Sequence, residues 1–181
     1  MTTCNRPQTI QEMAELLGRY RYVELVLFAI TGRGVLRSSE AGLAVRLSAV
    51  SHAHAYRAEL IERRLLVSDG LDHAPESTKA PSTEHEVLFE ILEQLSAEEL
   101  IATLAFAWYP AMLDAYQHRL ARCDKASEGP IRLMLSRMNF DLEAIITNLS
   151  DVCDSSRFVS EVTAMKGHIV DVNGPFGTLS L

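Results

Sequence analysis

Two histidines lie two residues apart in the middle of the segment Leu43–Leu65, which contains no glycine or proline. Its helix-forming residues predict one long helix. Apolar side chains recur along it every three or four positions, and His54 falls on that stripe, whereas His52 points to a different side of the helix. An imidazole on an apolar stripe is either a hydrogen-bonded core residue or a ligand or general base.

A carboxylate interrupts the apolar face of the predicted helix that precedes this segment. Glu24 shares that face with Leu17 and Leu27. One interpretation is a buried acid that is paired with an arginine such as Arg137. The other is a metal ligand, or a general acid or base whose pKa is raised by desolvation.

Two further pairs of polar residues stand four positions apart on later predicted helices, a spacing that brings side chains together on one face. Asp114 and His118 could form an oriented base, or an exposed helix pair. Arg137 and Asp141 could contribute to a site, or form a structural ion pair. The tyrosines and the single tryptophan are expected mainly in the core or at its rim, with one or two phenols available to a ligand.

The residues singled out in this way form two groups. The expected catalytic residues are Glu24, His52, His54, Asp114, His118 and Asp141. The residues expected to bind a substrate are Tyr20, Tyr56, Trp108, Tyr109, Arg137 and Met138. A largely apolar pocket that holds a few such polar groups suits proton transfer to or from an apolar small molecule.

Helices must position these side chains, and the sequence marks where several of them begin and end. Capping-box patterns occur at Thr9–Glu12 and at Ser96–Glu99. The first helix is expected to end near Thr31, before the glycines of Gly32–Gly34. Pro110 lies inside the third long helical pattern and is expected to kink it.

Four long amphipathic helices with one long middle connection predict an all-α four-helix bundle with extra short helices. The middle connection comprises a loop at Val67–Glu84 and a short amphipathic helix at His85–Leu95. We expect one domain over the whole chain, with the bundle at about 9–154 and a C-terminal extension at 155–181. Within the extension, only residues 158–165 could add a helical turn or two.

Composition and charge narrow the class of protein. The chain has 181 residues and a net charge of -7, which argues against a nucleic-acid partner because such a partner needs a concentrated basic face. The apolar runs are too short to span a bilayer, so no membrane partner is expected. Three cysteines without ligand spacing and a polar N-terminal arm without a signal peptide indicate free thiols and a cytoplasmic protein.

Three segments carry a resemblance to a known family: LLGRYRYVELVLFAITG, SHAHAYRAELIERRL and YPAMLDAYQHRLARCDKASEGPIRLML. Together they resemble the ferritin-like superfamily, and more narrowly its non-haem di-iron proteins of the tRNA hydroxylase type, over roughly residues 12–151. The resemblance implies two metal ions between four helices. One glutamate from each of two helices and a Glu-x-x-His pair from each of the other two would hold them.

The chain departs from that ligand pattern, because neither histidine has a glutamate three residues before it. Met138 stands where the alignment with the family expects a glutamate, and Asp141 where it expects the last ligand. The same alignment places His52 inward, whereas the apolar stripe favours His54, so both stay candidates. We expect a reduced or lost di-iron site and no cofactor. The alternative is iron held by Glu24, His52, Asp114 and Asp141.

Three functions are open at this point. The first is an enzyme that uses acid/base chemistry, in cyclisation, isomerisation or dehydration, on an apolar small molecule of a biosynthetic pathway. The second is a non-haem iron hydroxylase or oxygenase with an unusual ligand set. The third is a non-catalytic helical protein that binds a partner or dimerises, its buried polar groups forming a satisfied network. A homodimer is expected through the apolar residues of His85–Leu95.

Overall fold

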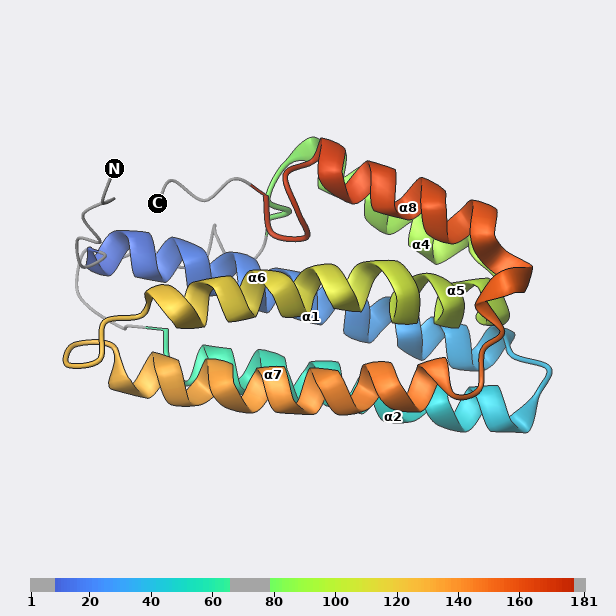
Figure 1. The fold of residues 1–181 in the computed structure, drawn as a ribbon, viewed down its shortest axis with the longest axis horizontal. Coiled ribbons are helices and arrows are strands. Elements are labelled where there is room, and N and C mark those ends of the chain that lie inside the picture. Colours follow the sequence, from blue (N-terminus) through green and yellow to red (C-terminus); the bar gives the residue numbers. More distant parts are fainter. Residues whose placement is uncertain (1–8, 66–78, 178–181) are drawn as a thin grey trace.

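The computed structural model describes residues 9–65 and 79–177, and the regular secondary structure of this part is entirely helical (Figure 1). The all-α prediction is confirmed for these residues. None of their helices combines the length and the apolar character that crossing a membrane requires. The predictions for the arm at 1–8, for residues 67–78 of the middle loop and for the last four residues lie outside the described part.

Three long helices and one composite helix lie side by side along the long axis of the molecule (Figure 1). They are α1 (Ile10–Arg37), α2 (Ala41–Glu62), α7 (Gly129–Ser150) and the succession of α5 (Ala97–Thr103), η1 (Leu104–Trp108) and α6 (Tyr109–Arg122). α1 runs antiparallel to α2 and contacts it, and α6 runs antiparallel to α7 and contacts it. The buried apolar side chains of all of them form one core.

Both predicted capping boxes are formed. At the start of α1, Thr9 accepts a hydrogen bond from the backbone N–H of Glu12, whose carboxylate accepts one from the backbone N–H of Thr9. Ser96 and Glu99 make the same pair of bonds at the start of α5. Each box satisfies backbone donors that have no partner inside the helix, which is why the sequence alone indicates where these two helices begin.

α1 runs through the glycines where it was expected to end. It continues past Gly34 to Arg37, and Ser38 then takes extended backbone angles (φ -76°, ψ 126°). Gly34 is buried, and a Cβ at this position would lie 3.0 Å from Leu100 Cδ2 and 3.3 Å from Leu47 Cδ1. The prediction was wrong because this glycine allows a close approach between helices and does not terminate one.

Gly34→Val is expected to lower the free energy of unfolding by about 1–3 kcal/mol, because its methyl groups would overpack the contact with Leu47 and Leu100. Gly167→Ala in α8 (Val159–Asp171) is the matched control, since a Cβ there meets nothing within 4 Å. Alanine should raise stability at that position by about 0.5–1 kcal/mol through helix propensity. Urea denaturation followed by circular dichroism measures both changes. Similar effects in the two variants would contradict the close packing at Gly34.

A π-helical turn precedes Pro110, where a kink was expected. The backbone N–H of Tyr109 donates to the carbonyl of Leu104 across η1, which is the i→i+5 pattern. Because proline has no N–H and its ring crowds the preceding turn, the α-helical ladder is interrupted there. Trp108 and Tyr109 lie fully buried at the end of this widened turn.

The short helix of the middle connection is present as α4 (Thr83–Gln94), close to the predicted His85–Leu95. Its apolar side chains Leu88 and Leu92 are buried in the common core, and Val87 is the exposed large apolar residue of this helix. The surface that was expected to form a homodimer is therefore largely used inside the molecule.

The C-terminal extension is more regular than predicted. η2 (Ser155–Phe158) leads into α8, which contacts η1 and α5. α8 is longer than the one or two turns expected because Val162, Met165 and Ile169 give it a buried stripe at helical spacing. Figure 1 shows α8 and α4 on the same side of the long helices.

Candidate functional site

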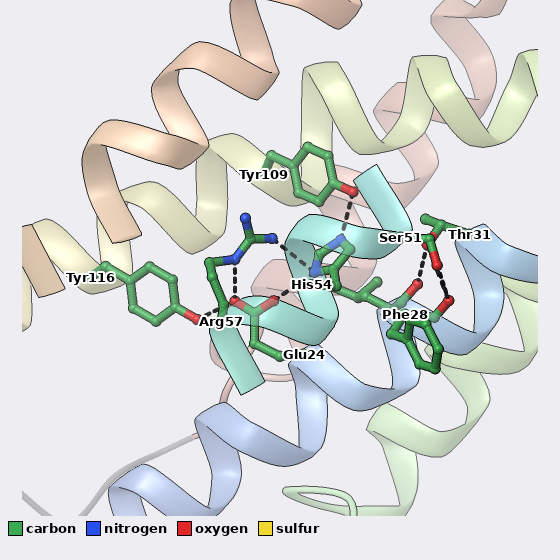
Figure 2. Close-up of polar contacts among 9 residues, drawn as sticks. Glu24, Phe28, Thr31, Ser51, His54, Arg57, Tyr109 and Tyr116 are labelled. Atoms are coloured by element: carbon green, nitrogen blue, oxygen red, sulfur yellow. Dashed lines mark hydrogen bonds and ion pairs between the residues drawn. The ribbon is translucent and has the colours of Figure 1, made fainter. Parts of the chain in front are cut away.

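Five buried polar side chains meet between α1, α2 and α6 (Figure 2). We call them the central cluster, and they are Glu24, His54, Arg57, Tyr109 and Tyr116. The exposure of Glu24, His54 and Arg57 is 0%. The glutamate comes from α1, the histidine and the arginine from α2, and both tyrosines from α6, so three helices must pack together before the cluster exists.

Both carboxylate oxygens of Glu24 are paired. Oε1 accepts hydrogen bonds from Arg57 Nε and from the hydroxyl of Tyr116, each at 2.9 Å. Oε2 lies 2.6 Å from Nδ1 of His54. On the far side of that imidazole, Nε2 lies 2.8 Å from the hydroxyl of Tyr109. The cluster is therefore a continuous chain of contacts from one tyrosine to the other (Figure 2).

Burial and the contacts between the side chains together determine which groups of the central cluster are charged. Burial by itself would raise the pKa of Glu24, but Arg57 and His54 lower it from 4.5 to about 2. Burial and the nearby Arg57 charge lower the pKa of His54. Burial opposes the charge of Arg57, but the Glu24 carboxylate outweighs it and raises the pKa of the guanidinium. At neutral pH the cluster holds one carboxylate, one guanidinium and one neutral imidazole.

The neutral imidazole carries one proton, and the geometry assigns it to Nδ1. An ionised carboxylate only accepts hydrogen bonds, so the 2.6 Å contact with Glu24 requires an N–H at Nδ1 of His54. Nε2 is then an acceptor, and Tyr109, a phenol whose pKa is raised by burial, donates to it. Arg57 Nη2 also lies 2.8 Å from Nδ1, but it cannot donate to a protonated nitrogen, so this is a close contact only.

The arginine expected to pair with Glu24 was the wrong one. Arg137 is exposed on α7 and lies over the ring of Tyr56, 5.1 Å from its centroid, whereas Arg57 makes the ion pair. Sequence reasoning did not single out Arg57. The signal that could have found it is its spacing of three from His54, which puts both side chains on one face of α2.

The structure does not bring the predicted catalytic residues together. His54 lies in the central cluster, but His52 is exposed on α2, so the apolar stripe and not the family alignment identified the inward histidine. Asp114 and His118 are exposed on α6, and Asp141 is half-buried on α7. None of these last three side chains bonds to the central cluster.

The residues predicted to bind a substrate also lie in different places. Trp108, Tyr109 and Met138 are fully buried, and of these Tyr109 belongs to the central cluster. Tyr56 is half-buried on α2. Tyr20 is nearly buried, and burial raises the pKa of its phenol. Tyr20 also lines a cavity between α6 and α8.

The central cluster does not fit a two-metal centre. A bridged pair of ions needs several carboxylates, but Glu24 is the single carboxylate of the cluster and both its oxygens accept hydrogen bonds. The Arg57 guanidinium would also repel a cation in its place. Across residues 9–65 and 79–177, no group of three or more His, Cys, Asp or Glu side chains could hold a metal ion. The four residues of the alternative iron site do not form one cluster. Glu24 is buried, Asp141 is half-buried, and His52 and Asp114 are exposed.

A pocket of about 430 Å³ lies between α6, α8 and the turn at 173–177, and we call it the α6–α8 pocket. Most of its lining is apolar, including alanines of α6 and Ile169 of α8. Three residues that the sequence singled out line it as well: Tyr20, Asp114 and His118. The pocket therefore combines an apolar interior with a few polar groups, as small-molecule sites do.

Packed aromatic rings separate the α6–α8 pocket from the central cluster. Tyr20 and Phe176 line the pocket, with ring centroids 4.4 Å apart. Behind them lies Tyr116, at 4.9 Å from the Tyr20 ring and 5.1 Å from the Phe176 ring. Since Tyr116 donates to Glu24, the pocket and the cluster share this aromatic wall. The wall is closed, because the exposure of Glu24 is zero.

A buried histidine holds the turn that forms one side of the pocket. His85 of α4 contacts the carbonyl oxygen of Gly174 through Nε2 (3.0 Å) and the hydroxyl of Ser82 through Nδ1 (2.9 Å). Gly174 and Gly177 have positive φ angles of 89° and 69°, which favour glycine. Sequence reasoning missed this link because no local pattern connects residues 89 positions apart.

No protein-family model, curated protein or solved structure matches this chain. The resemblance to the ferritin-like superfamily therefore stays a prediction that rests on the three segments named above.

Proposed function

We propose that this protein is a non-catalytic helical binding protein, and that it binds an apolar small molecule in the α6–α8 pocket. The observation that carries the proposal is the separation of reactive groups from the cavity. Glu24 and His54 are closed off in the central cluster, while the cavity lies beyond the aromatic wall. A paired, buried network of this kind contributes to a well-defined packing of the helices.

Catalysis in the central cluster would need a group that can reach a substrate. A general base must lie within about 3 Å of the substrate atom that carries the proton to be removed. Both ring nitrogens of His54 already face protein partners, and its side chain has no exposure. The cluster therefore supports stability better than it supports turnover.

The polar groups at the pocket are also not arranged as an acid/base pair. Asp114 and His118 lie one turn apart on α6, but among the described residues no hydrogen bond joins them. The contact of His118 Nε2 is with Arg122 Nη1, at 3.5 Å. A catalytic imidazole is normally oriented by a carboxylate at its second nitrogen. These side chains suit a rim that makes one or two hydrogen bonds with a mainly apolar ligand.

A pocket-filling variant tests this function. The neutral fluorophore N-phenyl-1-naphthylamine is expected to bind saturably to the wild-type protein. Ala115→Phe, which would fill the pocket, should weaken binding about tenfold or more. Ala121→Phe on the exposed side of the same helix is the matched control and should bind like wild type. Absence of saturable binding, or wild-type affinity in Ala115→Phe, would contradict the proposal.

We also propose that the fold is related to the ferritin-like bundles and that the chain has lost the two iron ions of that family. The long connection between α2 and α5 supports a ferritin-like four-helix bundle in which the di-iron site is lost. The Arg57 guanidinium then supplies the positive charge beside Glu24 that a metal ion would otherwise bring.

Metal analysis tests this part of the proposal. After expression with added iron and manganese, and after anaerobic reconstitution with ferrous iron, the protein should contain no stoichiometric metal. Stoichiometric iron that is lost in Glu24→Ala would instead support the non-haem iron oxygenase.

One observation favours a second function, the acid/base enzyme. His54 stands between the carboxylate of Glu24 and the phenol of Tyr109, which is the order of groups in a proton relay. Isomerisation or cyclisation of an apolar compound by the purified protein, lost in His54→Gln and kept in Ala121→Phe, would support the enzyme over the binding protein.

A further inference from the structure

The α6–α8 pocket has a carboxylate at its rim that has no cationic partner. Asp114 of α6 lines the pocket and is exposed. Among the residues that the structure describes, its side chain forms no ion pair. An ionised carboxylate only accepts hydrogen bonds, so a ligand that reaches Asp114 meets a negative charge and an acceptor.

The two other titratable side chains on α6 at the pocket do not compensate this charge. Arg119 is buried, and its guanidinium pairs with Glu128, with Nη2 and Oε1 2.5 Å apart. His118 Nε2 lies 3.5 Å from Nη1 of Arg122. Because a guanidinium only donates, the imidazole accepts there and is neutral. The uncompensated charge on this side of the pocket is therefore negative.

The opposite side of the pocket also favours a cation. Ile169 and Val170 of the last turn of α8 line it, together with Asn173 just beyond the helix. The C-terminal end of a helix carries a partial negative charge, which attracts cations. The rings of Tyr20 and Phe176 belong to the lining as well, and the face of an aromatic ring attracts a cation.

We propose that the ligand of the α6–α8 pocket is a hydrophobic amine, an apolar molecule that carries an ammonium group at one end. The ammonium group pairs with Asp114 at the rim, and the hydrocarbon part lies against Ala111, Ala115 and Ile169. This inference rests on the proposed binding function and adds the charge of the ligand. Because Asp114 is exposed, its charge mainly selects between ligands, and apolar contacts supply most of the affinity.

Three ligands of equal chain length test the charge: octylamine, octanol and octanoate. Each is titrated into the complex of the wild-type protein with N-phenyl-1-naphthylamine. Octylamine should displace this fluorophore with a Kd about fivefold lower than that of octanol, and octanoate should bind more weakly than octanol. Added salt should reduce the difference between octylamine and octanol, because it screens charges at the surface.

Asp114→Asn removes the charge and keeps the size of the side chain. In this variant the ratio of the octanol Kd to the octylamine Kd should fall from about five to about one. Glu90→Gln removes an exposed carboxylate of α4 that does not line the pocket, and it should keep the wild-type ratio. Both substituted side chains are exposed, so both variants are expected to keep the circular dichroism spectrum of the wild type.

Equal affinities of octylamine and octanol in the wild-type protein would overturn the inference, and so would a preference for octylamine that persists in Asp114→Asn. The proposed binding function would survive either result, provided that the fluorophore binds saturably and Ala115→Phe weakens it. If neither the fluorophore nor, by calorimetry, octylamine binds to the wild-type protein, both the function and this inference fail.

Discussion

Glu24→Ala is expected to lower the free energy of unfolding by about 3–5 kcal/mol. The substitution leaves the Arg57 guanidinium and the Nδ1 proton of His54 buried without the carboxylate that pairs with them. Loss of one partner of a buried ion pair is costly because the remaining charge has neither water nor an acceptor. Urea denaturation followed by circular dichroism measures the change.

Two comparisons make this result specific to the central cluster. Glu59→Ala removes an exposed carboxylate that pairs with Arg63 on α2, and it should change stability by no more than about 0.5 kcal/mol. Glu24→Leu combined with Arg57→Met removes both buried charges at similar volume and should recover most of the loss. A cost for Glu24→Ala no larger than that for Glu59→Ala would show that the cluster does not depend on its carboxylate.

Acid is expected to destabilise the protein in two successive ranges of pH. The pKa of His54 is lowered from 6.5 in the folded state, so the unfolded chain takes up a proton first and stability falls as the pH drops below 6.5. The pKa of Glu24 is lowered from 4.5 to about 2, so its contribution is complete above pH 4.5 and is lost as the pH falls towards 2. The Glu24 contribution amounts to about 3 kcal/mol.

Thermal unfolding of wild type and Glu24→Gln between neutral and acidic pH tests the second range. Glutamine has nearly the same shape and keeps one oxygen acceptor, but it does not titrate. The Tm of Glu24→Gln should therefore fall less steeply than that of wild type below pH 4.5. Parallel curves in this range would mean that another carboxylate carries the acid sensitivity.

Near-neighbour patterns in the sequence were enough to locate most helices and to orient their faces. The capping boxes at Thr9 and Ser96 depend on residues three positions apart, so they could be identified without any tertiary information. Helical periodicity placed Glu24 and His54 on inward faces, and the structure buries both. The same reasoning failed at Gly34, because a glycine inside a helix and a glycine after a helix look alike until the neighbouring helices are known.

The partners across the core could not be predicted in this way. Periodicity tells which side of its own helix a residue occupies, but it does not give the rotation, the register or the distance of the helix opposite. Glu24 was therefore matched with Arg137 on α7, although the packing of α1 on α2 brings Arg57 to it. Asp114 and His118 could be an oriented base or an exposed helix pair for the same reason, and the structure places both at the lining of an outer pocket.

The sequence by itself determined the helical class of the described chain and the inward positions of the glutamate and one histidine, because these depend on local propensity and period. Only the tertiary structure decided that Arg57 neutralises Glu24 and that aromatic rings close the central cluster. The tertiary structure also places the turn at 173–177 beside α6, and this contact forms the α6–α8 pocket. These features depend on how whole helices pack, and that geometry results from the combined fit of many core side chains.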